Sequence, residues 1–231
     1  MIKVKYVWLS DFVYGGIDGA VTTYAVVAGV HGAQLSVAII LILGFANLLA
    51  DGFSMAVSKY TSDKAEKDRI QKIRRLEYES IERKPEEERA EIKTILQQQG
   101  FTGEALRQAE QVITSNKDRW VQFMIHNEFN VVEEAIYPAK SAVTTFAAFL
   151  VVGIIPLLGY LVTPFFPYNA NVIFYLTTGF TMLALFFVGT IKSIFSDQHW
   201  LYSGLYTVAI GGIAASLAYV VGYVLRGLGA V

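Results

Sequence analysis

The chain contains no cysteine and only three histidines among its 231 residues. Without cysteine it can form neither disulfides nor thiolate metal sites, so any metal ion must be bound by oxygen, imidazole or thioether ligands. The histidines form no HxxxH or ExxH pair, which argues against the di-iron site of a carboxylate bundle. There is also no phosphate-binding loop, nucleophile–histidine pair or nucleic-acid-binding motif. We therefore expect no enzyme activity, no prosthetic group, no ATP-driven pumping and no nucleic-acid partner.

Charge is almost balanced over the whole chain, with a formal net charge of −1, but its distribution is uneven. Residues 61–137 carry 16 acidic and 13 basic side chains, whereas the rest of the chain carries 4 acidic and 6 basic ones. This pattern indicates a charged segment inserted into a membrane protein. We expect transmembrane helices 1 and 2 in residues 1–60, a helical insertion in 61–137 and transmembrane helices 3 to 5 in 138–231.

Five hydrophobic stretches are each long enough to cross a bilayer core, which takes about 20 residues. No small-residue cleavage site follows the first of them, so we expect it to remain in the mature protein. The predicted fold class is an all-α integral membrane protein with five transmembrane helices and a cytoplasmic helical metal-binding insertion between spans 2 and 3. The five stretches are Phe12–Val30, Leu35–Val57, Ser141–Val162, Val172–Ile191 and Tyr202–Leu225.

The distribution of lysine and arginine predicts the orientation. If the N-terminus is cytoplasmic, the inside face carries Lys3, Lys5, Lys140 and Lys192 in addition to the basic residues of the insertion. The outside loops then carry no lysine or arginine, and the outside tail carries only Arg226. This asymmetry follows the positive-inside rule and predicts a cytoplasmic N-terminus and insertion.

The insertion reads as a small helical module. The second span runs on without glycine or proline, which predicts one helix that continues to Lys84. A second helix begins at Pro85, where three glutamates complement the helix dipole, and stops before Gly100. A third helix follows Gly103. We expect a fourth from about Lys117 to Ile136, ended by Pro138, and we expect Pro156 to kink the third span.

Asp18 lies within the first apolar stretch and Asp51 within the second. A carboxylate at membrane depth costs a few kcal/mol, so such residues usually face a bundle interior or a polar path. Both aspartates adjoin glycines, which let helices or a ligand approach closely. An ion or proton path is the favoured interpretation; the alternative is a carboxylate near a helix end that reaches the lipid headgroups.

Asn47, Asp51 and Met55 are spaced four apart and therefore share one helix face. An amide oxygen, a carboxylate and a thioether suit a softer first-row ion such as iron(II) better than magnesium or calcium. The alternative for Met55 is a packing role. On the first span, Asp11 and Asp18 fall near one face.

Five insertion residues have metal-ligand chemistry at helical spacing, including the Glu88–Glu91 and Met124–Glu128 pairs. By spacing alone, the glutamates read more readily as solvated helix faces balanced by lysine and arginine. The five residues are Glu77, Glu88, Glu91, Met124 and Glu128.

Nearly the whole chain resembles the vacuolar iron transporter family. The resemblance is carried by DFVYGGIDGAVTTYAVVAGVHGAQLS, by LGFANLLADGFSMAVSKY, and by a glutamate-rich insertion that closes with WVQFMIHNEF before three more spans. It implies five spans per protomer, a homodimer with the ion path at the two-fold interface, and export of iron(II), often with manganese(II), in exchange for protons. It also implies that Asp18 and Met55 line the translocation path. The cytoplasmic metal-binding set that it implies is Glu77, Glu88, Glu91, Met124 and Glu128.

Three positions depart from the family pattern. Asn47 stands where plant members have a membrane glutamate, Ser80 replaces a glutamate, and Ile125 replaces a second methionine. We therefore expect fewer ligands in the insertion and weaker metal binding there, unless Glu79 or Glu82 substitutes for the missing glutamate. Asp51 is expected to make up part of the charge missing at Asn47.

The leading hypothesis is a homodimeric proton-coupled exporter of divalent metal in the lipid bilayer. A manganese-dedicated transporter of the same architecture remains open, as does a membrane metal sensor or scaffold without transport. The short termini indicate a prokaryotic protein of the cell membrane; in a eukaryote we would expect the vacuolar membrane.

Overall fold

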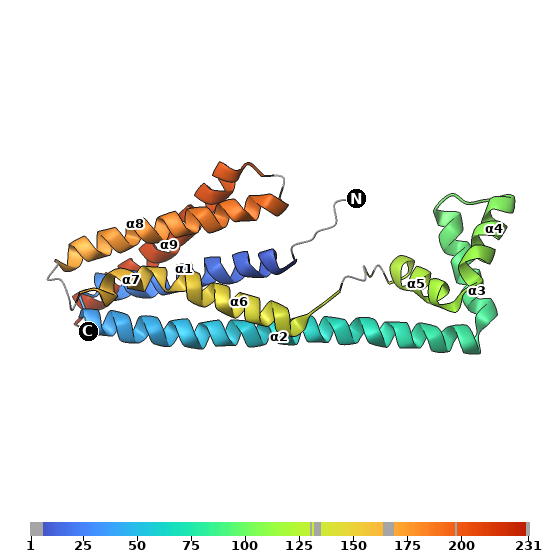
Figure 1. Cartoon of the computed structure of the whole chain (residues 1–231), viewed down its shortest axis with the longest axis horizontal. Coiled ribbons are helices and arrows are strands. Elements are labelled where there is room, and N and C mark those ends of the chain that lie inside the picture. Colours follow the sequence, from blue (N-terminus) through green and yellow to red (C-terminus); the bar gives the residue numbers. More distant parts are fainter. Residues whose placement is uncertain (1–6, 130, 132–134, 164–168, 197, 230–231) are drawn as a thin grey trace. The chain divides into compact units, whose positions relative to one another are not determined.

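The structure is a computed structural model that describes residues 7–129, 131, 135–163, 169–196 and 198–229 (Figure 1). These residues are mostly helical, with no β-strand among them. The chain divides into two compact units. The membrane unit comprises Met1–Tyr60 and Pro138–Val231, and the insertion unit comprises Thr61–Tyr137.

Each of the five apolar stretches lies within helical structure, which confirms the all-helical prediction. Within the described residues, four helices are long and apolar enough to cross a membrane, and a bent pair makes a fifth candidate span. The helices of the membrane unit are α1 (Val7–Gly32), α2 (Val37–Arg83, which continues into the insertion unit), α6 (Pro138–Gly153), α7 (Ile155–Leu161), α8 (Ala170–Lys192) and α9 (Trp200–Gly227), with a 3₁₀ turn η1 (Ser193–Phe195) after α8.

The third span is bent by 43° between α6 and α7. Pro156 occupies the first turn of α7, where a missing backbone N–H is tolerated and the preceding helix cannot continue undisturbed. The predicted kink at Pro156 is therefore confirmed.

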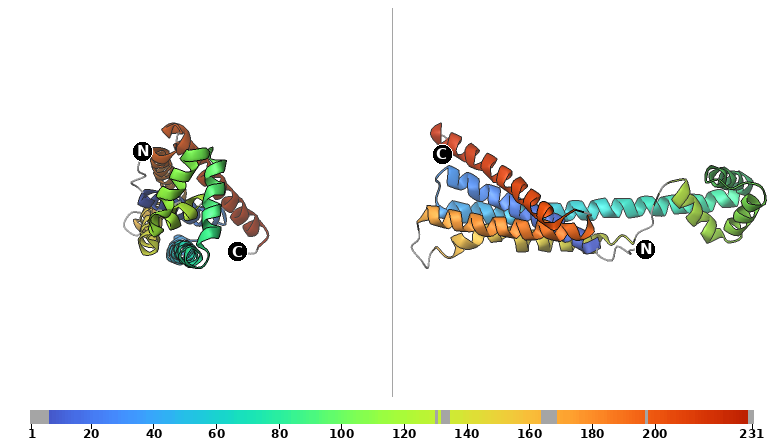
Figure 2. Two further views of the ribbon diagram at one scale, coloured as in Figure 1. Left: turned by 90° about the vertical axis from the view of Figure 1, so that its right-hand side faces the viewer. Right: turned by 90° about the horizontal axis from the view of Figure 1, so that it is seen from above.

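Helix α1 is the centre of the membrane unit and contacts α6, α7, α8 and α9 (Figure 2). Close approach to α6 requires a glycine at position 19, because a Cβ there would lie 2.9 Å from the Cα of Phe149. On the other side, Gly222 of α9 packs directly on the backbone at Gly29. Small residues thus let α1 pack at backbone distance on two neighbours, as expected for helices that associate within lipid.

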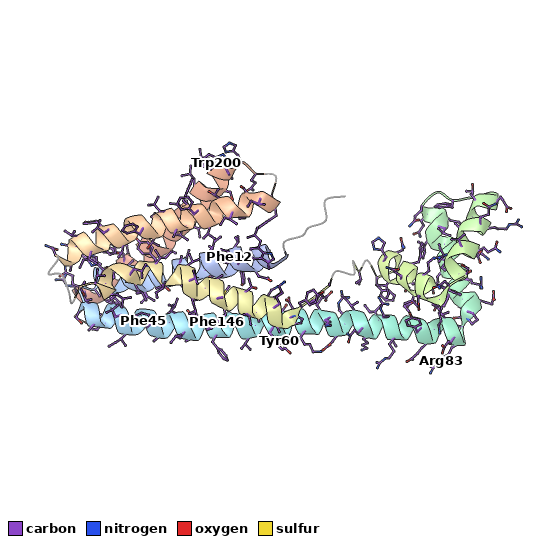
Figure 3. The ribbon with its side chains drawn as sticks, viewed as in Figure 1. Phe12, Phe45, Tyr60, Arg83, Phe146 and Trp200 are labelled. Carbon is purple, nitrogen blue, oxygen red and sulfur yellow. The ribbon has the colours of Figure 1, made fainter. Side chains whose placement is uncertain are left out.

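The apolar part of α2 packs mainly through side chains. Leu48 contacts Gly153, and Phe146 of α6 lies over Gly52 (Figure 3). Only 22% of the most apolar window of α2 is buried in the protomer, against 56% for α1. One long face of α2 is therefore left without a partner within the chain.

The insertion unit is built from the second half of α2 and from α3 (Pro85–Gln98), α4 (Gly103–Thr114) and α5 (Lys117–Asn127). The continuous helix through the end of the second span and the helix starts at Pro85 and Gly103 are confirmed. Helices α2, α3 and α5 contribute most of the buried core of this unit. That core comprises Ile81, Ile92, Leu96, Trp120, Val121, Met124, Ile125 and Val131.

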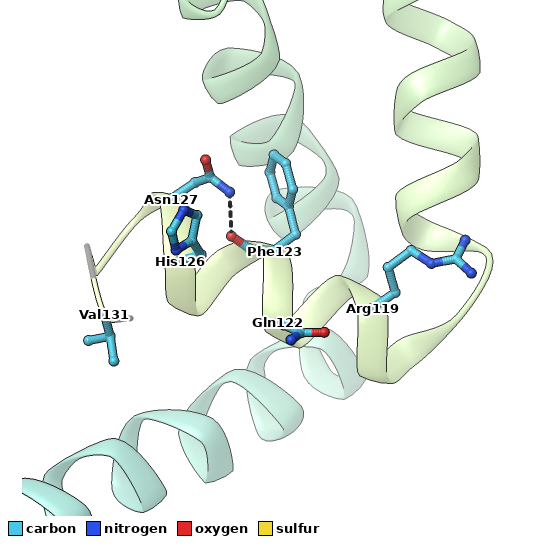
Figure 4. A pocket seen from close by; sticks show the side chains of 6 residues that line it. All are labelled: Arg119, Gln122, Phe123, His126, Asn127 and Val131. Carbon is cyan, nitrogen blue, oxygen red and sulfur yellow. Dashed lines mark hydrogen bonds between the residues drawn. The ribbon is translucent and has the colours of Figure 1, made fainter. Parts of the chain in front are cut away.

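The prediction of a final insertion helix from Lys117 to Ile136 is wrong at its end, because α5 stops at Asn127. The Asn127 amide donates a hydrogen bond of 2.8 Å to the Phe123 carbonyl (Figure 4), a local bond that competes with helix continuation. Val131 then turns back, donates its N–H to the Ile125 carbonyl and becomes buried in the core. Pro138, expected to end this helix, instead begins α6.

Candidate functional site

The two intramembrane aspartates lie on consecutive helices of the membrane unit. Asp18 is half-buried on α1, where Thr22 donates a 2.8 Å hydrogen bond to its backbone carbonyl. Asp51 on α2 is exposed on the protomer surface. The two carboxylates are close enough to repel each other. The structure thus brings together two negative charges that the sequence places 33 residues apart.

Asn47 and Met55 flank Asp51 by one helical turn on either side, and both are half-buried. The Asn47 amide nitrogen is fully buried and has no hydrogen-bond partner in the described part of the chain. A buried amide without a hydrogen bond is costly, so Asn47 is a polar group held inside an apolar helix interface at a cost in free energy.

The glycines beside the aspartates serve helix packing. A Cβ on Gly16 would lie 3.0 Å from the side chain of Val152, and one on Gly52 would lie 3.1 Å from the Phe149 ring. Phe149 therefore packs between the helix that carries Asp18 and the helix that carries Asp51. Of the two roles open to these glycines, close approach of helices is the one observed.

Four predicted glutamates of the insertion unit converge. Glu77 and Glu88 are buried, at 5% and 8% exposed, while Glu91 and Glu128 remain exposed. All three of the others repel Glu77, and both Glu88 and Glu91 repel Glu128. One carboxylate oxygen on each of Glu77 and Glu88 is buried without a hydrogen-bond partner among the described residues. These glutamates are therefore not simply a solvated helix face.

Burial and mutual repulsion alter how the cluster holds protons. Burial, followed by the charges of Glu128, Glu88 and Glu91, raises the pKa of Glu77 to about 7. The pKa values of Glu88 and Glu128 are also raised, mainly by burial and then by repulsion from Glu91. A cluster of this kind favours neutralisation by protons or by a cation.

Ser80 has a role at this cluster that sequence reasoning missed. Its hydroxyl forms a hydrogen bond with the Glu88 side chain and offsets part of the pKa rise there. The sequence indicated only the loss of a glutamate at this position. Glu82, by contrast, pairs with Lys117 and is exposed, so it does not replace the missing carboxylate.

Met124 is completely buried in the core of the insertion unit, one turn before Glu128. Across the described residues, no group of three or more Asp, Glu or His side chains is arranged to hold a metal ion. The residues have ligand chemistry suited to a divalent ion, but their arrangement is not that of a metal site.

A separate cavity of about 380 Å³ lies on α5 and contains none of the predicted site residues. Figure 4 shows its lining of Arg119, Gln122, Phe123, His126, Asn127 and Val131.

The raised pKa of Glu77 predicts how the stability of the insertion unit depends on pH. The native state holds a proton that the unfolded chain releases near pH 4.5 and that the folded chain releases only near pH 7. The free energy of unfolding should therefore fall by about 3 kcal/mol as pH rises from about 4.5 to about 8, and then level off. Buried Trp120 reports on this unit once exposed Trp8 and Trp200 are replaced by Phe. The free energy of unfolding is measured by denaturant titrations of that full-length variant at a series of pH values. Adding Glu77→Gln should flatten its dependence on pH, and adding Glu104→Gln should preserve that dependence. Equal slopes with and without Glu77 would contradict the prediction.

Comparison with known proteins places these features in a family. The model of the VIT family matches residues 9–223. The chain is 32% identical over 224 residues to the vacuolar iron transporter of Plasmodium falciparum, covering 94% of this chain and 82% of that protein. It is 33% identical over 225 residues to the vacuolar iron transporter of Toxoplasma gondii, covering 95% and 74%. Identity to vacuolar iron transporter 1 of Arabidopsis thaliana is 31% over 217 residues, covering 94% and 85%.

Proposed function

Because this chain belongs to the VIT family, we propose that it exports divalent metal, chiefly iron(II), from the cytosol across a membrane in exchange for protons. The observation that carries this proposal is that Asp18 of α1 and Asp51 of α2, each inside an apolar stretch, lie within range of mutual electrostatic repulsion. Carboxylates at membrane depth are costly and mark ion or proton pathways. Iron transport is also what the names of the related proteins state.

The exchange follows from the chemistry of the carboxylate pair. A divalent ion beside Asp18 and Asp51 neutralises their repulsion, and so do protons. A pair that must be neutralised by one or the other couples the movement of metal in one direction to that of protons in the opposite direction. Asn47 supplies an amide oxygen and Met55 a thioether along the same helix.

The insertion unit acts as the cytoplasmic collector of metal in this proposal. Its glutamate cluster binds ions from the cytosol and passes them to Met55 and Asp18. The cytoplasmic placement is supported by the lysine and arginine asymmetry. Metal binding by this unit is supported by the buried unpaired oxygens of Glu77 and Glu88. Met124 is the soft ligand that the family resemblance implies.

A homodimer is supported by the exposed face of α2. Asp51 is exposed on α2, and only a small share of the apolar window of this helix is buried. A carboxylate on that face would meet lipid in a single protomer, which is costly. A second copy of the chain covers the face and encloses Asp51 in a polar path at the two-fold axis.

The cargo is distinguished through Met55. A thioether favours iron(II) over harder ions such as magnesium, because it is the softest ligand on the helix face formed by Asn47, Asp51 and Met55. Manganese(II), which is intermediate, is a second cargo. The chain contributes to iron homeostasis at the cell membrane in a prokaryote or at the vacuolar membrane in a eukaryote.

Met55→Ala should weaken the preference for iron(II) over magnesium more than it reduces the maximal iron flux. The truncation removes the ligand that separates soft ions from hard ones but leaves both carboxylates in place. Competition of magnesium with iron(II) uptake in proteoliposomes measures this preference. Met182→Ala serves as the control, because Met182 lies on α8 and not on the helix face formed by Asn47, Asp51 and Met55. An equal loss for all ions would identify Met55 as a packing residue.

The proposed function is tested by metal flux into proteoliposomes that hold the purified full-length chain under an imposed pH gradient. Iron(II) uptake should require the gradient and should dissipate it. A non-transporting metal sensor or scaffold would bind iron(II) without flux. A manganese-dedicated transporter would move manganese(II) at a high rate and iron(II) at the background rate.

A further inference from the structure

An ion pair joins α1 to α2 close to Tyr60, the last α2 residue that belongs to the membrane unit. The Lys59 ammonium lies 3.3 Å from the Asp11 carboxylate. Asp11 is buried at 6% exposed, and the Lys59 side chain is 29% exposed. Neither residue is part of the carboxylate pair or of the insertion cluster.

The helix register places this pair in line with the proposed path. Asp11 precedes Asp18 by seven residues, which is two turns on one face of α1. Lys59 follows Met55 by one turn and Asp51 by two. Helices α1 and α2 run in opposite directions (Figure 1). The rise from Asp11 to Asp18 is about 10 Å and that from Asp51 to Lys59 about 12 Å, so the two pairs are separated by similar distances along both helices.

We propose that Lys59 is a built-in counter-cation of the metal path, paired with Asp11 so that the charged stripe, formed by Asp11, Asp18, Asp51 and Lys59, contributes from each copy of the chain the charge that one divalent ion balances. With all groups ionised, Asp11, Asp18 and Asp51 contribute three negative charges and Lys59 one positive charge. The net charge of the stripe per protomer is therefore minus two. This inference deepens the proposed function and rests on it.

A purely structural role, in which the ion pair only holds the two helices together, explains the pair less well. A buried ion pair is often no more stabilising than an apolar pair of the same size, because both charges must be desolvated. Asp18 and Asp51 already repel each other, so a third carboxylate without a cation would deepen the electrostatic well and hold a metal ion too tightly to release. The Lys59 ammonium, one helical turn after Met55, offsets that excess negative charge.

The test compares iron(II) affinity across charge variants of the full-length chain in proteoliposomes. Lys59→Met, which keeps an unbranched side chain, should lower the KM for iron(II) about threefold to tenfold and reduce the maximal rate, because the stripe becomes more negative. Asp11→Asn should raise the KM by a similar factor. The double variant Asp11→Asn/Lys59→Met restores the net charge and should return the KM to within about twofold of wild type, as should Lys59→Arg. Lys140→Met, which removes an exposed cation from the first turn of α6, is the matched control and should leave the KM unchanged.

Opposite KM shifts for the two single variants, cancelled in the double variant, support the counter-cation. Shifts in the same direction, or loss of thermal stability without a change in KM, would overturn it and leave a purely structural role. If Asp11→Asn fails to fold, the comparison of Lys59→Met with Lys59→Arg decides the question. Equilibrium binding of iron(II) to the purified chain must show the same opposite shifts in Kd. That arm separates failure of this proposal from failure of transport itself.

Discussion

Replacing Asp18 with asparagine should reduce iron(II) transport to the background rate of protein-free vesicles. The amide keeps the shape of the side chain but loses the negative charge that faces Asp51 and the site that exchanges a proton for metal. Helix α1 should stay in place, because its packing depends on Gly19 and Gly29 and not on the carboxylate. The initial rate of iron(II) uptake under a pH gradient measures the loss.

Folding and assembly of this variant are checked by its thermal melt and by size-exclusion chromatography in detergent. The matched control is Glu104→Gln, which removes one exposed carboxylate paired with Arg107 in the insertion unit and should keep the wild-type rate. Transport near the wild-type rate in the Asp18 variant would remove this residue from the path.

Replacing Glu77, Glu88, Glu91 and Glu128 together with glutamine should abolish the stabilisation of the insertion unit by metal. In the wild-type chain, a divalent ion at a hundredfold excess over its dissociation constant should stabilise this unit by about 2.7 kcal/mol. The variant should lose that gain and be more stable without metal at pH 7, because four repelling carboxylates become neutral amides. Transport should slow but persist through Asp18.

The measurement is a Trp120 fluorescence melt of the full-length chain, with Trp8 and Trp200 replaced by Phe, with and without anaerobic iron(II) or manganese(II). The control variant changes four exposed glutamates outside the cluster, Glu82, Glu86, Glu87 and Glu104, and should retain the full metal effect. Superimposable wild-type melts with and without metal would show that the cluster is not a binding site.

The helices could be predicted because their signals are local. Apolar runs about 20 residues long, Pro85 at a helix start and Pro156 inside a span each determine conformation through neighbouring residues. The end of α5 could not be predicted in this way. No glycine or proline marks Asn127, and the helix stops there because the chain turns back to bury Val131 in the core of the insertion unit and to bond its N–H to the Ile125 carbonyl.

The candidate site, like the fold, could be predicted only where its signals are local. Periodicity placed Asn47, Asp51 and Met55 on one face of a helix, and the resemblance to a family selected the insertion glutamates. Spacing alone favours solvated helix faces for those glutamates. The reason is that a local sequence pattern reveals neither the burial of a side chain nor its repulsion by charges on other helices. The buried oxygens of Glu77 and Glu88 and the hydrogen bond from Ser80 depend on how α2, α3 and α5 pack.

By itself, the sequence determined the class of the protein, an all-helical membrane protein of the VIT family, because hydropathy and charge along the chain dictate which segments can enter lipid. Only the tertiary structure decided which charges meet. It set Asp18 against Asp51, joined Asp11 to Lys59 and left Asp51 on an uncovered face of α2. The physical reason is that electrostatic interactions act between atoms close in space, and the register between two helices is set by the packing of all their neighbours.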